Sequence, residues 1–258
     1  MSYRSIFRPD LFAGQTIIVT GGGSGLGRCM AHELASLGAH TILIGRTLEK
    51  LETVAGEIIE DGGSCSFYSQ DIREEDGVAE TVKTIVNDRG QIHGLVNNAG
   101  GQYPSPLAVI TKNGFEAVVS SNLTGGFLMA REVFTQSMAD HGGAIVNMLA
   151  DMWRGMPIMG HSGAARSGME NLTMTAAVEW AVAGVRVNAV APGWVASSGM
   201  DTYQGAINDI WPKLRHAVPL KRIGRESEVS AAVAFLLSEG ASFITGSTIR
   251  IDGGAMQM

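Results

Sequence analysis

The stretch of this sequence that decides the fold is Thr20-Gly21-Gly22-Gly23-Ser24-Gly25-Leu26-Gly27. A short β-branched run, Thr16-Ile17-Ile18-Val19, precedes it and predicts a buried strand, and apolar residues recur at helical spacing from Leu26 to Leu37. A glycine turn between a strand and a helix brings the N–H groups and the positive dipole end of the helix close to a pyrophosphate. Because a second apolar strand, Thr41–Gly45, follows, the turn predicts a dinucleotide site rather than a plain tight turn.

Length and composition predict one α/β domain in a reducing, cytoplasmic setting. The chain has 258 residues, 45% of them hydrophobic, which is enough for one sizeable core. Its 19 Lys and Arg against 25 Asp and Glu give a net charge of -6, which disfavours a nucleic-acid partner. Cys29 and Cys65 are the only cysteines, so neither a disulfide framework nor a metal site is expected. No signal-peptide core or membrane-spanning apolar run occurs, so we expect no membrane partner.

Periodicity predicts further strands and helices in alternation. Strands are expected at Cys65–Ser69, Leu95–Val96, Ala144–Met148, Val185–Val190 and Thr248–Ile251. Helices are expected at Leu48–Glu60, Gly114–Ser121, Leu123–Ala139, Met169–Val182 and Glu226–Leu237. Alternation of this kind is typical of a parallel sheet covered by helices.

The glycine spacing, Gly21, Gly25 and Gly27, resembles that of the short-chain dehydrogenase/reductase family, whose pattern is Thr-Gly-x-x-x-Gly-x-Gly. Asn97-Asn98-Ala99-Gly100 and the loop Ala191 to Ser197 match later motifs, so the resemblance covers nearly the whole chain. It implies one doubly wound Rossmann domain over residues 1–258 with a seven-stranded parallel sheet, a substrate-binding segment at about 195–225, and a homotetramer.

The resemblance also implies which residues hold the cofactor. In and after the glycine turn these are Gly21, Ser24, Gly25, Leu26 and Gly27. Further along the chain they are Asp71, Ile72, Asn97, Ala99, Gly100, Arg166, Pro192, Gly193, Val195 and Ser197, of which Ser197 keeps the hydroxyl of the usual threonine.

The residue after the second strand distinguishes NADP from NAD. An acidic residue there bonds the ribose hydroxyls in an NAD site, whereas a basic residue accommodates the phosphate of NADP. Here Gly45 is followed by Arg46, so we expect NADP(H) rather than NAD(H). The alternative is a solvated arginine before a helix that Thr47 caps. Asp71 is expected to contact the adenine ring, to cap the helix that follows, or both.

The catalytic segment departs from the family pattern. Most members follow the fifth strand with a serine and then with Tyr-x-x-x-Lys. Alignment on the segment after the family lysine places Arg166 at the lysine, Ser162 at the tyrosine and Leu149 at the serine. No tyrosine occurs between Tyr103 and Tyr203.

The missing tyrosine favours reduction of an enoyl thioester over reduction of a ketone. Ketone reduction develops charge on an alkoxide oxygen and needs a well-placed acid. Reduction of an enoyl thioester develops an enolate, which hydrogen-bond donors stabilise, and the proton for carbon can come from another group or from water. His161 to Arg166 and Glu179-Trp180 also resemble the family branch of the peroxisomal trans-2-enoyl-CoA reductases and 2,4-dienoyl-CoA reductases.

Five residues are candidates for catalysis. By family position, Arg166 is expected to bind the nicotinamide ribose rather than to form a structural salt bridge, and Asn122 to hold a relay water at a helix kink. Ser162 is either a hydrogen-bond donor or a helix cap, and His161 either relays a proton or packs inside the protein. Asp151 stands fifteen residues before Arg166, where one subgroup of dienoyl reductases carries a working tyrosine. It is an acid if burial raises its pKa, and otherwise a solvated loop carboxylate.

The segment from Ser198 to Arg225 is mixed in character, which is typical of a lid or substrate-binding segment. Several large side chains either wall an acyl tunnel with it or fill the core: Met148, Met152, Trp153, Met156, Met159 and Trp194. The sequence therefore predicts NADPH-dependent reduction of an enoyl-CoA or related acyl thioester. Two alternatives stay open: oxidation of a long or branched alcohol, such as a terpenoid, with Asp151 or His161 as base, and a non-catalytic cofactor-binding regulator.

Overall fold

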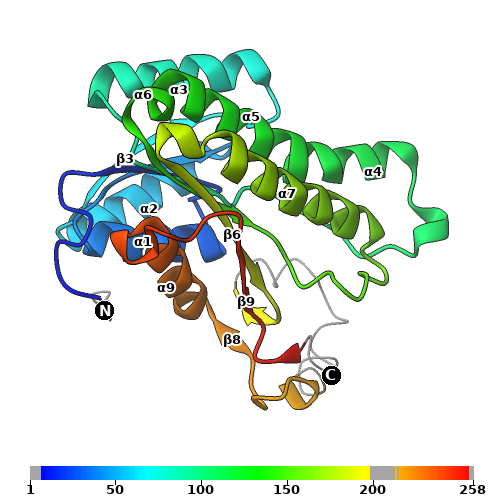
Figure 1. Ribbon diagram of the computed structural model, residues 1–258. Helices are drawn as coiled ribbons and strands as arrows, with labels where there is room; N and C mark the ends of the chain where they lie inside the picture. The colour runs from blue at the N-terminus through cyan, green and yellow to red at the C-terminus, as the bar shows by residue number, and fades with distance from the viewer. Residues whose placement is uncertain (1–6, 198–212, 214, 256–258) are drawn as a thin grey trace.

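The computed structural model of the chain describes residues 7–197, 213 and 215–255, and its centre is a parallel sheet of seven strands (Figure 1). The strand order is β3-β2-β1-β4-β5-β6-β9, which confirms the predicted doubly wound Rossmann fold. The strands are β1 (Thr16–Thr20), β2 (His40–Gly45), β3 (Ser64–Ser69), β4 (Gly94–Asn97), β5 (Gly143–Met148), β6 (Val185–Pro192) and β9 (Thr248–Ile251). Because the order reverses between β1 and β4, a crevice opens at the carboxyl ends of these two strands.

Helices cover both faces of the sheet. They are α1 (Gly25–Ser36), α2 (Leu48–Glu60), α3 (Glu75–Arg89), α4 (Lys112–Val119), α5 (Gly125–Val133), α6 (Ala139–His141), α7 (Gly160–Glu179) and α9 (Glu226–Leu237). Ile17 and Val19 pack with α1, α2 and α9, whereas Ile18 between them packs with α3, α5 and α7. This alternation follows from the two-residue period of a strand, which sends successive side chains to opposite layers. No helix in the described part of the chain is both long and apolar enough to cross a membrane.

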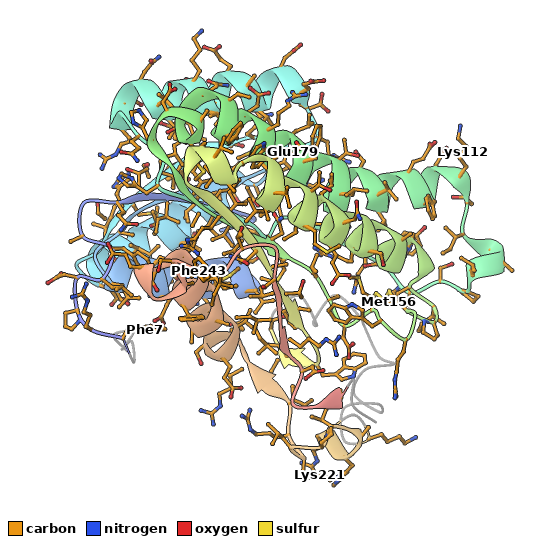
Figure 2. The ribbon with its side chains drawn as sticks, viewed as in Figure 1. Phe7, Lys112, Met156, Glu179, Lys221 and Phe243 are labelled. Atoms are coloured by element: carbon orange, nitrogen blue, oxygen red, sulfur yellow. The ribbon has the colours of Figure 1, made fainter. Side chains whose placement is uncertain are left out.

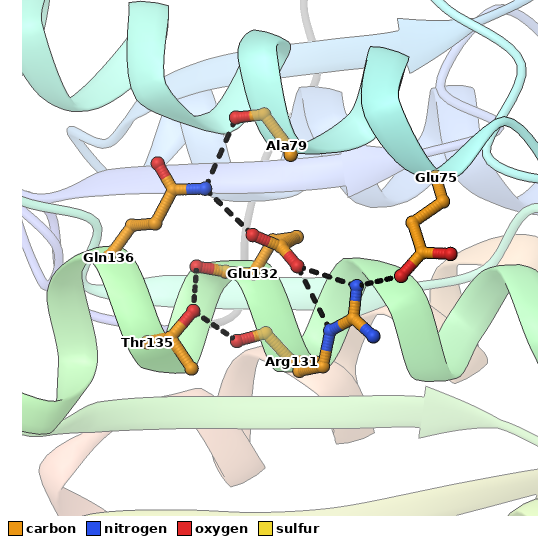
Figure 3. A network of polar contacts seen from close by, with 6 residues as sticks. All are labelled: Glu75, Ala79, Arg131, Glu132, Thr135 and Gln136. Atoms are coloured by element: carbon orange, nitrogen blue, oxygen red, sulfur yellow. Dashed lines mark hydrogen bonds and ion pairs between the residues drawn. The ribbon is translucent and has the colours of Figure 1, made fainter.

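The helical stretch from Lys112 to His141 is interrupted by two π turns, η2 (Ser120–Thr124) and η3 (Phe134–Met138). It starts earlier than predicted because Thr111 caps α4, its side chain accepting the Gly114 N–H at 3.1 Å. Figure 3 shows how this stretch is tied to α3: Arg131 lies 2.6 Å from a Glu75 carboxylate oxygen, and Gln136 Nε2 donates to the Ala79 carbonyl oxygen at 3.1 Å. Exposed ion pairs of this kind contribute about 0–1 kcal/mol each, so apolar packing carries most of the stability.

Two helix ends differ from the sequence interpretation. The helix predicted to run to Val182 ends at Glu179 and continues as a 3-10 turn, η4 (Ala181–Ala183). Gly184 follows with a left-handed backbone, φ of 73°, which stops a helix. At α2, Thr47 occupies the N-cap position as one interpretation predicted, but its side chain makes no capping hydrogen bond.

A second, two-stranded parallel sheet was not predicted. It pairs β7 (Val195–Ala196) with β8 (Gly224–Arg225) and joins the two ends of the predicted substrate-binding segment. Strands of two residues carry no periodic signal in a sequence. Most of that segment, residues 198–212 and 214, lies outside the described residues, and the lid predicted there lies outside them too.

Candidate active site

The candidate site begins at the glycine turn between β1 and α1. Gly21 has a left-handed backbone, with φ of 67°, which favours glycine. A Cβ atom on Gly27 would lie 2.1 Å from the Gly21 carbonyl oxygen, and one on Gly21 would lie 2.8 Å from Asn98 Nδ2. The turn therefore packs so tightly against the loop after β4 that only glycine fits at both positions. The N-terminus of α1 opens beside it, with Ser24 as the N-cap residue.

Two adjoining cavities lie along this turn, with volumes of about 420 Å³ and about 560 Å³. Such volumes are typical of small-molecule sites. The two cavities share lining residues from the glycine turn and the loop after β4: Gly21, Ser24, Ala99, Gly100, Gly101 and Gln102. Of the other residues predicted to hold the cofactor, Arg46, Asp71 and Ile72 line the smaller cavity, and Gly25, Leu26, Gly27, Arg166, Pro192, Gly193, Val195 and Ser197 line the larger. The fold thus brings together every predicted cofactor residue except Asn97.

Asn97 is the exception because its side chain faces the interior. It is buried, and its Nδ2 donates to Asn147 Oδ1 at 2.9 Å and to the Gly126 carbonyl oxygen at 3.0 Å. These bonds tie β4 to β5 and α5 rather than reaching a cavity. The neighbouring Asn98, which the sequence interpretation did not select, lines the larger cavity and donates from Nδ2 to the Thr20 carbonyl oxygen at 2.9 Å.

Cationic side chains gather around the smaller cavity. Arg46 lines it, as do Lys50 and Arg73, which the sequence interpretation missed. Asp71 accepts hydrogen bonds from Arg73 Nε at 2.9 Å and from the Arg73 backbone N–H at 3.1 Å. The Arg73 guanidinium holds the pKa of Asp71 below its usual value. Asp71 is not the cap of α3, because Glu74 occupies the N-cap position.

Arg166 lies on α7 and lines the larger cavity. Its guanidinium donates to the Met148 carbonyl oxygen at the end of β5. No carboxylate in the described residues pairs with it, so the structural salt bridge considered as an alternative does not form there. Burial lowers the pKa of Arg166 to about 10, which leaves the group charged at neutral pH. The cavity therefore contains a permanent positive charge.

Asn122 lies within the π turn η2, where the helix interruption was expected. Its Nδ2 donates to the Gly101 carbonyl oxygen at 2.6 Å and to the Val118 carbonyl oxygen at 2.8 Å. A π turn changes the main-chain hydrogen-bond pattern of a helix and is frequent at functional sites. Asn122 thereby fastens this turn to the loop that lines both cavities.

Ser162 holds a side chain of the cavity wall and does not cap α7. Met159 occupies the N-cap position, and the helix begins at Gly160. The Ser162 hydroxyl donates to Gln102 Oε1 at 2.5 Å, and Gln102 lines both cavities. Leu149, aligned with the serine of the family pattern, is buried.

His161 is fully buried beside Ser162. Its Nδ1 accepts the Ser162 backbone N–H at 2.8 Å, which places the proton of a neutral ring on Nε2. The ring meets Tyr103 edge to face, with 4.7 Å between the ring centroids. His161 thus packs into the interior, as one of the two interpretations predicted.

Asp151 lies in the loop between β5 and α7 and is half-buried. Its Oδ1 is closed off from solvent and has no hydrogen-bond partner among the described residues. Burial and the nearby Asp252 carboxylate raise the pKa of Asp151, while Arg250 and Arg154 oppose the rise. The Asp151 backbone N–H donates to the Pro192 carbonyl oxygen at 3.2 Å and fixes the loop beside β6. The direction of this pKa shift is the one that an acid role for Asp151 requires.

Asp252 is a candidate residue that the sequence interpretation missed. It follows β9, and a Cβ atom on Gly193 would lie 2.9 Å from its Cα, so it packs against the loop after β6. Its Oδ1 accepts the Gly254 N–H at 2.9 Å. The Asp-Gly-Gly sequence marks the end of a strand, but only the pairing of β9 with β6 brings this carboxylate near Asp151.

Comparison with known proteins shows to which family this chain belongs. The model of the family described as enoyl-(acyl carrier protein) reductase matches residues 21–256. The chain is a short-chain dehydrogenase/reductase. The peroxisomal 2,4-dienoyl-CoA reductase of Danio rerio, which produces (3E)-enoyl-CoA, is 35% identical over 257 residues, covering 98% of this chain and 85% of the relative.

Solved structures extend the comparison. The citronellol catabolism dehydrogenase of Pseudomonas aeruginosa is 68% identical, with a TM-score of 0.89, covering 98% of this chain and 99% of that one. A structure from Beutenbergia cavernae, assigned as an NAD(P)-dependent gluconate 5-dehydrogenase, holds NADP at low occupancy and is 30% identical, with a TM-score of 0.91 and coverage of 97% and 100%. The chain is therefore an NAD(P)-dependent oxidoreductase, and the hypothesis of a non-catalytic regulator loses its support.

Several buried polar side-chain atoms of this short-chain dehydrogenase/reductase have no hydrogen-bond partner among the described residues. Among the described residues, five buried side-chain atoms accept or donate no hydrogen bond: Asn97 Oδ1, Asn122 Oδ1, Asp151 Oδ1, His161 Nε2 and Arg166 Nε. Buried polar groups in proteins are nearly always bonded to protein, water or ligand. All but Asn97 belong to the residues predicted to be catalytic, which come from three separate elements. Of these residues, Arg166 lines the larger cavity, whereas Asn97, Asn122, Asp151 and His161 are not among the residues that line either cavity.

Proposed function

We propose that this enzyme reduces the carbon–carbon double bond of an enoyl-CoA, dienoyl-CoA or related acyl thioester with NADPH. One observation carries the proposal: the tyrosine and serine of the family are replaced by Ser162, bonded to Gln102, and by the buried Leu149, whereas Asp151 in the next loop has a raised pKa. Such a site lacks the phenol that protonates an alkoxide oxygen in ketone reduction. It retains a carboxylic acid that can protonate a carbon atom. The 35% identical dienoyl-CoA reductase supports the same chemistry.

The cofactor fits the residues around the two cavities. Gly21 and Gly27 leave no room for a Cβ atom, so backbone N–H groups at the start of α1 can approach a pyrophosphate. Arg46, with Lys50 beside it, supports NADP over NAD, and one relative of known structure holds NADP. Arg166, which lines the larger cavity, would bond the nicotinamide ribose. When bound, NADPH would supply the hydride, which goes to the β-carbon of an enoyl thioester or to the δ-carbon of a dienoyl thioester that becomes a (3E)-enoyl product, and the proton goes to the α-carbon.

Asp151 supplies the proton in this proposal. A general acid must be protonated at the working pH, and burial beside Asp252 keeps Asp151 protonated at higher pH than an exposed aspartate. The negative charge that develops on the thioester oxygen needs a donor or a cation. Arg166, which its pKa of about 10 keeps protonated at neutral pH, provides a positive charge in the larger cavity.

Asn122, Ser162 and His161 act as positioning residues. Asn122 donates to the Gly101 carbonyl oxygen and Ser162 donates to Gln102, so both fix the loop that lines the two cavities. His161 accepts the Ser162 backbone N–H and fixes the start of α7. A loop held in this way keeps cofactor and substrate in register, which is a large part of enzymatic rate enhancement.

Oxidation of a long or branched alcohol, such as an acyclic terpenoid, is the second candidate function. It is favoured by the 68% identical structure, which is a citronellol catabolism dehydrogenase. In this reaction Asp151 would act as the base and would have to be ionised, and Arg166 would stabilise the alkoxide. The two candidates thus require opposite protonation states of the same carboxylate.

We further propose a homotetramer in the cytoplasm. Met174, Val178 and Val182 lie four residues apart on the outer side of α7 and η4 and are 47%, 78% and 96% exposed. Phe243, before β9, is fully exposed as well (Figure 2). A row of exposed apolar side chains supports a contact between copies of the chain. No disulfide joins Cys29 and Cys65 within the described part of the chain, which supports a reducing compartment.

Initial rates as a function of pH test the function. NADPH oxidation is measured with trans-2-enoyl-CoA and 2,4-dienoyl-CoA thioesters, and NADP or NAD reduction with long-chain and terpenoid alcohols. Thioester reduction should fall as pH rises through the raised pKa of Asp151, because the protonated acid is lost; alcohol oxidation should rise over the same range. Asp151→Asn should lower the rate by about 10²–10⁴-fold with NADPH affinity unchanged. Turnover of alcohols without turnover of any thioester would overturn the leading proposal.

A further inference from the structure

Residues 213–225 concentrate positive charge in a chain that is acidic as a whole. This stretch holds five Lys and Arg residues and no Asp or Glu, whereas the whole chain has a net charge of -6. We call residues 213 and 215–225 the basic segment. In the described structure only one of its cations forms an ion pair: Arg222 Nη2 lies 2.6 Å from a Glu228 carboxylate oxygen. Because cations gathered on one surface attract anions, the basic segment favours an anionic ligand.

The basic segment lies beside the larger cavity. Its last residue belongs to β8, and the pairing of β8 with β7 places Arg225 opposite Ala196. Ala196 stands between Val195 and Ser197, and both of these residues line the larger cavity. Arg225 itself is exposed and is not among the residues that line either cavity. The positive charge of the basic segment therefore lies outside the larger cavity, next to its wall.

The end of β9 holds the middle of the basic segment in place. The Leu220 N–H donates to the Gly253 carbonyl oxygen at 3.2 Å, and a Cβ atom on Gly253 would lie 2.6 Å from Cγ1 of the buried Val218. Lys221 follows with a left-handed backbone, φ of 55°, and its N–H donates to the Val218 carbonyl oxygen at 2.8 Å. Lys221 lies at the lower edge of the molecule in Figure 2. Its side chain thus stands on a turn whose backbone is bonded to the end of β9.

Arg250, on β9, adds a positive charge on the side of Asp151. The Arg250 Cζ atom lies 4.3 Å from the centroid of the Trp153 ring, and Trp153 is two residues beyond Asp151 in the same loop. Arg250 is exposed, and its charge lowers the pKa of Asp151 against the effect of burial. The positive surface therefore extends from the basic segment to the loop that carries the candidate acid.

The cofactor does not account for these cations. Its pyrophosphate is proposed to lie at the glycine turn, and its additional phosphate near Arg46 and Lys50 in the smaller cavity. The basic segment contributes none of its described residues to the lining of either cavity. A ligand that reaches the basic segment must therefore extend out of the larger cavity.

We propose that the basic segment and Arg250 bind the phosphate groups of coenzyme A, while the acyl thioester end of the same molecule occupies the larger cavity. Coenzyme A carries a pyrophosphate and a further phosphate on its ribose, and Arg and Lys side chains bind phosphate oxygens by charge-assisted hydrogen bonds. A long pantetheine arm separates these phosphates from the thioester, so the two ends can occupy separate sites. The inference rests on the proposed function, since an alcohol carries no phosphate.

Binding with and without the nucleotide tests this inference. Affinities are measured by calorimetry at saturating NADP⁺, which occupies the cofactor site, for butanoyl-CoA and for S-butanoyl-N-acetylcysteamine, which has the same acyl thioester and no phosphate. The wild type should bind butanoyl-CoA at least about tenfold more tightly. Raising NaCl from about 0.05 M to about 0.5 M should weaken butanoyl-CoA binding by about tenfold, because salt screens exposed charges.

A double variant assigns the effect to the basic segment. Arg215→Gln with Lys221→Asn removes two exposed cations, and asparagine tolerates the left-handed backbone at this position, so Tm should stay within about 2 °C of the wild type. Butanoyl-CoA affinity should fall by about tenfold or more, and NADPH affinity should stay within about twofold. Lys112→Gln is the matched control and should bind like the wild type, because the Lys112 side chain is 84% exposed and lies well apart from Lys221 (Figure 2).

The outcomes separate this phosphate site from the proposed function. Butanoyl-CoA affinity that is insensitive to salt, or that is equal in the double variant and in Lys112→Gln, would overturn the inference. Reduction of the trans-2-butenoyl thioesters of N-acetylcysteamine and of CoA with equal kcat/KM would also overturn it, and the leading function would then stand. If butanoyl-CoA binds as expected but no thioester is reduced, the phosphate site stands and the leading function falls.

Discussion

Gly100, in the loop after β4, lies against the π turn η2 and α7, and its replacement tests the geometry of the site. A Cβ atom on Gly100 would lie 2.3 Å from Asn122 Oδ1 and 3.1 Å from an Arg166 Nη atom. Asn122 is not free to withdraw, because its Nδ2 is bonded to the Gly101 carbonyl oxygen at 2.6 Å and the Val118 carbonyl oxygen at 2.8 Å. Gly100→Ala therefore forces the loop or the π turn to move.

The expected loss of stability in Gly100→Ala follows from these contacts. Overpacking costs about 1–3 kcal/mol, and one broken hydrogen bond adds about 0.5–1.5 kcal/mol, so the free energy of unfolding should fall by about 2–4 kcal/mol. At about 2–4 °C per kcal/mol for a domain of this size, Tm should fall by about 4–16 °C. Because Gly100 lines both cavities, NADPH affinity should fall by about tenfold or more in the same variant.

Thermal unfolding by circular dichroism and NADPH titration by fluorescence measure the two effects. Gly101→Ala is the matched control, since no atom lies within 4 Å of a Cβ atom there, and its stability should stay within about 0.5 kcal/mol of the wild type. In the double variant with Asn122→Ala, the losses should be less than additive by about 1 kcal/mol or more, because the clash is gone. A Gly100→Ala protein as stable as Gly101→Ala, or strict additivity with Asn122→Ala, would refute the reasoning.

Three further changes have defined outcomes. Asp252→Asn removes a charge that raises the pKa of Asp151, so the pH–rate profile of thioester reduction should move to lower pH at saturating NADPH; an unmoved profile would contradict the coupling of the two carboxylates. Arg166→Met removes the cation from the larger cavity and should raise affinity for NADP⁺ relative to NADPH by about tenfold in fluorescence titrations, because the oxidised nicotinamide is itself cationic. Arg166→Lys is its control and should keep the wild-type ratio. Arg46→Ala should weaken NADPH binding by about tenfold and NADH binding by less than twofold; equal losses would show that Arg46 does not meet the additional phosphate.

The elements of the fold were largely predictable from the sequence. The helices Leu48–Glu60 and Glu226–Leu237 and the strand Thr248–Ile251 have the predicted bounds. They were predictable because helix and strand periods are local properties, set by which side chains must face the core. The glycine turn was equally predictable, because tight packing and a left-handed backbone admit few residues other than glycine. The two-residue strands β7 and β8 and the exact ends of α7 were not predictable, because they carry no periodic signal.

The sequence by itself determined the Rossmann fold and the resemblance to a reductase family whose catalytic tyrosine and serine this chain lacks, because both depend on residue types at fixed spacings. Only the tertiary structure decided what stands in their place. The sheet order brings together residues that are far apart in the chain: Ser162 donates to Gln102, and the Asp252 carboxylate lies near enough to Asp151 for the two charges to interact. The raised pKa of Asp151 depends on burial and on a second carboxylate, and both are properties of packing that no local pattern encodes.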